Sequence, residues 1–169
     1  MTDILLDTGA LLGFLGPSFA AAAVGGRLTV RSLGPWYAGL RKPTWTPSGA
    51  RIGFIWTVLY LLMALAAWSL WREIGFASPI PWIAYVVQLA LNVAWSALFF
   101  GLRNLRAAFA EILALWAAIL ITLVTFAAVA PLAGLLLLPY LVWVAIAGTL
   151  NLKVWRMNLD VAGPRSVSA

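Results

Sequence analysis

The stretch from Ile112 to Leu152 decides the fold: "ILALWAAILITLVTFAAVAPLAGLLLLPYLVWVAIAGTLNL". It runs for 41 residues without a charged side chain. As one α-helix it would be about 60 Å long, twice the thickness of the hydrocarbon core of a bilayer. The stretch must therefore fold back on itself, and "VAPLAG" (Val129–Gly134) is its only good turn sequence. We expect two membrane-spanning helices that meet at this turn.

The composition of the whole chain agrees with a protein surrounded by lipid. Of its 169 residues, 64% are hydrophobic and 9% are charged, whereas soluble domains carry roughly 25% charged residues. The chain has no cysteine and no histidine, which excludes disulfides, thiol nucleophiles, histidine bases and the commonest metal ligands. We therefore expect no metal site and no conventional catalytic residues. The net charge of +6 indicates membrane orientation rather than nucleic-acid binding.

Apolar segments of spanning length predict five transmembrane helices, at about 4–26, 51–71, 79–102, 106–129 and 133–155. The first segment also suits a cleaved signal peptide, but Asp3 and Asp7 stand where such a peptide carries basic residues. The predicted fold class is thus an all-α integral membrane protein, a five-transmembrane-helix bundle over residues 1–158. A cytoplasmic tail follows at 159–169.

The basic residues predict the orientation. With five spans, the first loop (27–50), the third loop and the C-terminus share one side of the membrane. That side holds Arg27, Arg31, Arg41, Lys42, Arg51, Arg103, Arg106, Lys153, Arg156 and Arg165, whereas the other side holds only Arg72. The positive-inside rule then places the N-terminus outside and the C-terminus in the cytoplasm.

Three predicted helices each carry polar or aromatic residues on one face. These residues follow helical spacing and are Trp56, Tyr60 and Met63, then Gln88, Asn92, Trp95 and Phe99, then Tyr140, Trp143, Ala147 and Asn151. Amide side chains are costly in lipid and should face inward. Two interpretations stay open: the faces enclose a ligand cavity, or they only pack the bundle.

Glu111 is the one acid inside a predicted span. An intramembrane acid suggests a functional site. The alternative, which we favour, is structural: the macrodipole near the helix N-terminus stabilises the carboxylate, and Arg103 or Arg106 pairs with it.

Four motifs occur in a familiar order: "WYAGLRKPTWTPSG", "FIWTVLYLLMALAAW", "QLALNVAWSALFFGLR" and "LPYLVWVAIAGTLNLKVW". Together they resemble the translocator protein family, also called the tryptophan-rich sensory protein or peripheral benzodiazepine receptor family. The match runs from about Trp36 to Asn158. The resemblance implies a five-helix bundle, usually dimeric, whose pocket opens toward the cytoplasm beneath the first loop.

The resemblance also implies ligands and site residues. Known family ligands are porphyrins, including protoporphyrin IX and haem, together with cholesterol and synthetic isoquinoline carboxamides. The implied lid residues are Trp36, Tyr37, Lys42, Pro43, Trp45 and Pro47, and the implied pocket wall is Trp56, Tyr60, Asn92, Trp95, Tyr140, Trp143, Ala147 and Asn151. The cholesterol-recognition pattern is broken, because Leu152 and Lys153 stand where tyrosines belong.

The first loop suits a porphyrin, because aromatic rings stack on a macrocycle and cations pair with its propionates. The alternative is an interfacial anchor, with rings and cations among lipid headgroups. We expect a porphyrin receptor or transporter in a bacterial cell membrane, with porphyrin as ligand and no resident cofactor. The family link to light-dependent porphyrin breakdown leaves enzyme status open. The rival function is a structural protein that acts through a partner and binds porphyrin incidentally.

The first helix suggests a homodimer. Gly9, Gly13, Gly16, Ala20 and Ala23 form a stripe of small residues, which permits close approach of two helices. The alternative is that this stripe packs inside the bundle, against the second helix.

Overall fold

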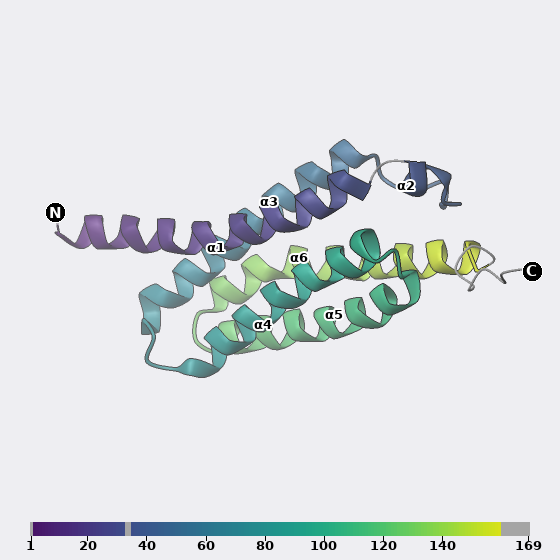
Figure 1. Cartoon of the computed structure of the whole chain (residues 1–169). Coiled ribbons are helices and arrows are strands. Elements are labelled where there is room, and N and C mark those ends of the chain that lie inside the picture. The colour runs from purple at the N-terminus through teal and green to yellow at the C-terminus, as the bar shows by residue number, and fades with distance from the viewer. Residues whose placement is uncertain (1, 33–34, 160–169) are drawn as a thin grey trace, which may run out of the picture.

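Long helices account for nearly all of the computed structural model, which describes residues 2–32 and 35–159, with the side chains of 7–27 and 36–159 (Figure 1). The helices are α1 (Thr2–Ser32), α2 (Pro35–Gly39), α3 (Gly49–Ile74), α4 (Pro79–Ser96), α5 (Leu105–Ala127) and α6 (Pro131–Met157). A π-helix, η1 (Ala97–Gly101), continues α4. The described residues include no strand. The predicted five-helix bundle is confirmed, because α2 is only a short helix within the first loop.

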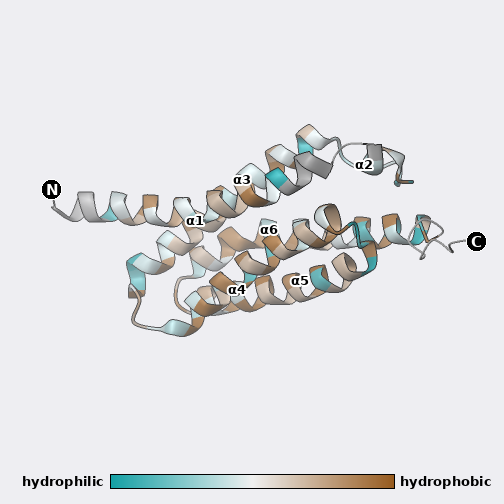
Figure 2. Ribbon diagram, in the orientation of Figure 1, coloured by the Kyte–Doolittle hydropathy of each residue, from teal (hydrophilic) through white to brown (hydrophobic). Residues whose placement is uncertain are grey.

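Each of the five long helices has a segment long and apolar enough to cross a bilayer: Asp7–Arg27, Gly49–Ile74, Pro79–Gly101, Leu105–Ala127 and Pro131–Met157. Hydrophilic residues gather mostly at the two ends of the bundle, and the helix sides between them are largely hydrophobic (Figure 2). The N-terminus and the C-terminal end of α6 lie at opposite ends of the bundle (Figure 1), as an odd number of crossings requires.

Local signals in the sequence set where the helices begin. The side chain of Ser48 accepts a 3.4 Å hydrogen bond from the backbone N–H of Arg51 and caps α3. The side chain of Asn104 caps α5 in the same way, through the N–H of Ala107 at 3.0 Å. Such caps satisfy backbone donors that a helix N-terminus leaves without partners. α6 begins at Pro131, within the turn predicted at 129–134.

Gly134 explains how α5 and α6 approach so closely after this turn. A Cβ atom added at Gly134 would lie 2.5 Å from the Cβ of Ala127 and 2.9 Å from its Cα. No side chain fits at that separation, so glycine is required here for steric reasons.

The helices form a closed ring in which each packs against two neighbours. In order around the bundle these are α1, α3, α6, α5 and α4, and α4 returns to α1. A large apolar core lies among them. A second, smaller core lies beneath the first loop and contains Leu40, Phe99, Phe100, Leu105, Ala108 and Val154.

The first loop is shorter than the predicted 27–50, because α1 continues to Ser32. Helix formation does not stop where hydrophobicity stops, and arginine is a good helix former. The short α2 begins at Pro35, as expected from the fixed φ angle of proline. Of the predicted tail at 159–169, residues 160–169 lie outside the described residues.

A candidate ligand cavity beneath the first loop

A cavity of about 660 Å³ lies beneath the first loop, at the same end of the bundle as the C-terminal end of α6. Its lining comes from α1, the first loop, α3, α4 with η1, and α6, and none of the described residues of α5 contributes. The volume is in the range of small-molecule sites, roughly 300–1,000 Å³.

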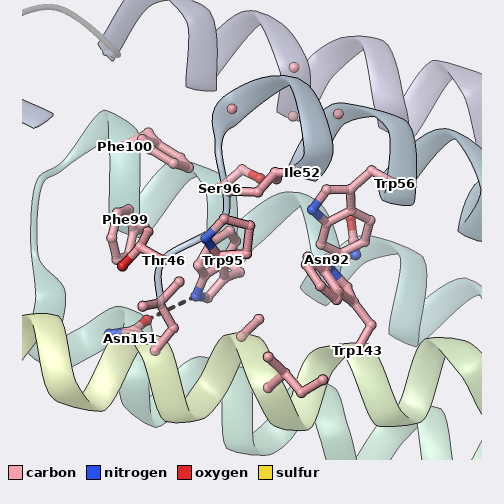
Figure 3. Close-up of a pocket in the computed structure, with 18 of the residues that line it drawn as sticks. Thr46, Ile52, Trp56, Asn92, Trp95, Ser96, Phe99, Phe100, Trp143 and Asn151 are labelled. Carbon is pink, nitrogen blue, oxygen red and sulfur yellow. Dashed lines mark hydrogen bonds between the residues drawn. The ribbon is translucent and has the colours of Figure 1, made fainter. Parts of the chain in front are cut away.

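Nine of the twelve predicted site residues line this cavity. They are Tyr37, Lys42, Trp56, Tyr60, Asn92, Trp95, Trp143, Ala147 and Asn151. Pro43 and Pro47 of the first loop line it as well. Figure 3 shows Trp56 and Trp143 at one end of the labelled group and Phe99 and Phe100 at the other. The structure therefore brings together the three helical faces that the spacing predicted.

A buried hydrogen-bonded chain joins three helices at one end of the cavity. The hydroxyl of Tyr60 donates to the side-chain oxygen of Asn92 at 2.6 Å. The amide nitrogen of Asn92 donates to the hydroxyl of Tyr140 at 2.9 Å. Tyr140 is fully buried and is not part of the lining. It lies behind the cavity and holds Asn92 in place, because the amide is hydrogen-bonded from both sides.

A second buried contact fixes a ring in the wall. The indole N–H of Trp95 donates to the side-chain oxygen of Asn151 at 3.1 Å, which Figure 3 marks as a dashed line. The amide nitrogen of Asn151 then donates to the backbone carbonyl of Leu105 at 3.0 Å. Asn151 thus uses both ends of its amide, and its partners lie on α4 and α5.

The first loop places one cation in the cavity wall. Lys42 is the one charged residue among the described residues that line the cavity. Its Nζ lies 4.3 Å from the centre of the Tyr37 ring and donates to the backbone carbonyl of Tyr37. Burial raises the pKa of the Tyr37 hydroxyl, so this ring stays neutral beside the ammonium.

Two predicted residues of the first loop lie outside the cavity lining. Trp36 packs edge-on against Phe99, with ring centres 6.2 Å apart, and Arg103 lies 5.5 Å from its ring centre. Trp45 is 43% exposed and lies beneath the Nζ of Lys153, at 5.6 Å. Both tryptophans hold the loop against the bundle from outside.

The indole N–H of Trp143 is buried and has no hydrogen-bond partner among the described residues. Buried donors without a partner are costly, by about 1–3 kcal/mol. Trp143 lines the cavity with its ring, whereas its N–H is buried and unused among the described residues.

α1 contributes to the cavity, which the sequence did not predict. Phe19, Ala22, Gly25 and Gly26 line it, and the Cβ of an added side chain at Gly25 would lie 3.1 Å from the Oγ of Ser96. These residues carry no polar or aromatic stripe. Apart from Phe19 they are small, and this small size was the available signal, because it lets α1 approach α4 closely.

Glu111 does not pair as we expected. Both of its carboxylate oxygens are buried and have no hydrogen-bond partner among the described residues. Arg106 lies five positions earlier, which places it about 140° away around the helix. Glu111 is also the seventh residue of α5, beyond the first turn where the macrodipole acts. The predicted pairing with Arg103 or Arg106 was wrong.

Comparison with known proteins shows to which family this five-helix architecture belongs. The TspO/MBR family model matches residues 14–156, which include most of each of the five spans and all the residues that line the cavity. The chain belongs to the TspO/MBR family.

Several relatives in the TspO/MBR family are similar over most of their length. The translocator protein of Sus scrofa is 42% identical over 136 residues, covering 79% of this chain and 80% of the relative. The protein CrtK of Rhodobacter capsulatus is 35% identical over 144 residues, covering 82% and 88%. The tryptophan-rich protein TspO of Archaeoglobus fulgidus is 36% identical over 156 residues, covering 92% and 99%. The resemblance seen in four sequence motifs is thereby confirmed, and with it an integral membrane protein.

Proposed function

We propose that this TspO/MBR protein is a membrane receptor or transporter whose cavity binds porphyrins such as protoporphyrin IX and haem. The observation that carries the proposal is the lining: tryptophan and phenylalanine rings on α3, α4 with η1, and α6 surround a space of about 660 Å³. The porphyrin macrocycle can stack on these rings. Its polar edge can pair with the cation at the first loop, Lys42.

The charge of the cavity favours an anionic ligand. Lys42 offers a cation for one propionate, and the described lining contains no acidic residue. No histidine or cysteine exists in the chain to ligate a haem iron. Metal-free protoporphyrin should therefore bind about as well as haem, and a haem preference beyond roughly 100-fold, about 2.7 kcal/mol, contradicts this form of the proposal.

A titration of the full-length protein in detergent tests the proposal. Protoporphyrin IX bound among the cavity tryptophans quenches their fluorescence, so the emission should fall in a saturable way at micromolar concentrations. Emission that stays unchanged at micromolar protoporphyrin rejects the receptor function. The same samples, followed by absorbance in light and in the dark, show whether bound porphyrin is broken down. Such breakdown would depend on the excited porphyrin with nearby tryptophans as redox partners.

A second candidate function is a structural role through a protein partner. The helix sides are largely hydrophobic (Figure 2), and a buried hydrogen-bonded network joins three helices. Both features are compatible with a bundle that serves as a scaffold. In that case the cavity affinity for protoporphyrin would be weak and unselective, and substitutions in the cavity would leave the partner interaction unchanged.

We also propose a homodimer that uses α1. Gly9, Gly13 and Gly16 are exposed, and a Cβ atom added at any of them meets no atom within 4 Å. The alternative that this stripe packs inside the bundle therefore loses its support. A flat helix face on which these glycines meet no other described segment of the chain within 4 Å suits a close contact with a second copy.

The proposed orientation places the cavity end of the bundle in the cytoplasm, in a bacterial cell membrane. Arg41, Lys42, Arg103, Lys153 and Arg156 lie in the first loop, after η1 and at the end of α6. Arg72 lies at the other end, 3.7 Å from Asp7. This asymmetry supports an outer N-terminus, by the positive-inside rule. Cysteine labelling from either side of the membrane tests it, because the natural chain has no cysteine.

A further inference from the structure

Asn158 joins the first loop to the end of α6, next to residues that line the cavity. Its side-chain oxygen accepts a 3.0 Å hydrogen bond from the backbone N–H of Arg41, and its amide nitrogen donates to the backbone carbonyl of Arg41 at 2.9 Å. The same nitrogen donates to the carbonyl of Val154 at 2.7 Å. Asn158 is 2% exposed. The contact therefore links the first loop to the end of α6, across 117 positions of sequence.

The pattern of these bonds restrains the loop strongly. One amide pairs with both the N–H and the carbonyl of a single residue, as a peptide group does in a paired strand. The bond to Val154 fixes the amide on its own helix. Displacing Arg41 along the chain or away from α6 breaks two hydrogen bonds together, and leaves the buried side-chain oxygen of Asn158 without the N–H that it binds.

The position of Arg41 in the loop gives this contact a function. On one side, Leu40 is buried in the small core beneath the loop. On the other side, Lys42 and Pro43 line the cavity. Arg41 thus lies at the point where an anchored segment becomes part of the cavity wall. Farther along the loop, Trp45 is 43% exposed and lies beneath the Nζ of Lys153.

We propose that Asn158 is a latch that holds the first loop closed over the cavity, so that its hydrogen bonds to Arg41 control the rate at which ligands enter and leave. The latch acts through the backbone of Arg41. It does not depend on which ligand the cavity binds, and it goes beyond the proposed porphyrin-binding function.

Trypsin measures the opening of the loop in the full-length protein in detergent. The Arg41–Lys42 bond is a cleavage site, whereas the bond between Lys42 and Pro43 resists trypsin. Cleavage of a native protein requires local opening, so its rate reports the open population. In Asn158→Ala we expect cleavage after Arg41, identified by mass spectrometry, to be at least about tenfold faster than in the natural chain, equivalent to about 1.4 kcal/mol.

Two further variants make the result decisive. Met157→Ala shortens the neighbouring, 40% exposed side chain at the end of α6 without removing the latch, and its cleavage rate should stay unchanged. Leu40→Ala loosens the buried anchor and should also speed cleavage. If Asn158→Ala does not fold, Asn158→Asp replaces it in the assay: it removes the donor to the Arg41 carbonyl but keeps the acceptor for the Arg41 N–H, so cleavage should again be faster than in the natural chain, by a smaller factor.

Unchanged cleavage in Asn158→Ala, or an equal increase in Met157→Ala, overturns the latch. Stopped-flow mixing with protoporphyrin IX supplies a second readout: association and dissociation should both accelerate in Asn158→Ala, by at least about fivefold, with a smaller change in Kd, since one barrier governs both directions. An absence of protoporphyrin binding in the natural chain rejects the proposed function, whereas the trypsin rates still decide the latch.

Discussion

The indole N–H of Trp95 on α4 donates a 3.1 Å hydrogen bond to the side-chain oxygen of Asn151 on α6. Because the Asn151 amide also donates to the carbonyl of Leu105 on α5, one side chain fixes three helices at the cavity wall. Asn151 therefore has two roles: it lines the cavity, and it sets the orientation of an aromatic ring that lines the same cavity.

Replacing Asn151 with alanine should weaken protoporphyrin binding by roughly 1–3 kcal/mol. The Trp95 indole loses its acceptor, so its ring is no longer held against the cavity and its buried N–H lacks a partner. A titration followed by porphyrin absorbance measures the change. Thr149→Ala is the control, since Thr149 is exposed on the same helix and bonds only to the carbonyl of Ala145 among the contacts described. Equal effects of the two variants would contradict a specific role for Asn151.

Trp143→Phe should weaken protoporphyrin binding more than Trp82→Phe. Trp143 lines the cavity. The smaller ring of phenylalanine buries less area against the ligand, which corresponds to about 1 kcal/mol of binding free energy. Trp82 lies in a separate aromatic cluster, stacked on Phe14 with ring centres 5.4 Å apart, and its N–H bonds to the carbonyl of Gly75. The two Kd values are compared by absorbance titration. Similar weakening by both substitutions would indicate that these tryptophans only pack the bundle.

Lys42→Glu should weaken protoporphyrin binding by roughly 1–2 kcal/mol, because a partly screened charge pair with a propionate becomes a repulsion. A neutral aromatic ligand should be affected much less. Lys42→Gln separates the loss of the cation from the gain of a negative charge. It removes the cation and its contact with the Tyr37 ring without adding a negative charge. Equal loss of both ligands in Lys42→Glu would mean that the loop had come away from the cavity, and the charge-pairing explanation would be wrong.

Gly134→Ala should destabilise the bundle by about 1–3 kcal/mol or more, because the new methyl group overlaps with Ala127 at the α5–α6 turn. Gly148→Ala on the same helix is a matched control. Its Cβ would lie 3.6 Å from the side chain of Ile112, an ordinary contact distance. Thermal unfolding in detergent should show a lower midpoint for Gly134→Ala only. A midpoint that is unchanged in Gly134→Ala would show that the turn relaxes without cost.

Gly13→Leu should abolish the proposed homodimer without loss of the fold. The substitution places a bulky side chain on an exposed face of α1, where no other described segment of the chain comes within 4 Å of the new Cβ, so we expect it to obstruct an intermolecular contact. Chemical cross-linking in membranes measures the dimer, and circular dichroism checks the helices. Cross-linked dimers that persist in Gly13→Leu would exclude this face of α1 as the interface.

The sequence by itself determined the number of membrane crossings and which faces of the helices turn inward. Hydrophobic length is a local property, and an uncharged run of 41 residues interrupted by Pro131 can only form two spans. The aromatic and amide stripes were equally informative: Trp56, Asn92 and Trp143 lie around one cavity, because helical spacing alone decides which residues share a face.

Only the tertiary structure decided which parts of different segments meet. Small residues of α1 line the cavity, whereas Trp45 lies outside it, and neither result follows from periodicity. Glu111 has no hydrogen-bond partner within 2–32 and 35–159 although arginines precede it in the sequence, because its environment depends on the neighbouring helices. Asn158 bonds to Arg41 across 117 positions. Such contacts depend on how rigid helices pack side by side, and that packing is set by the shapes of all the faces together rather than by any one segment.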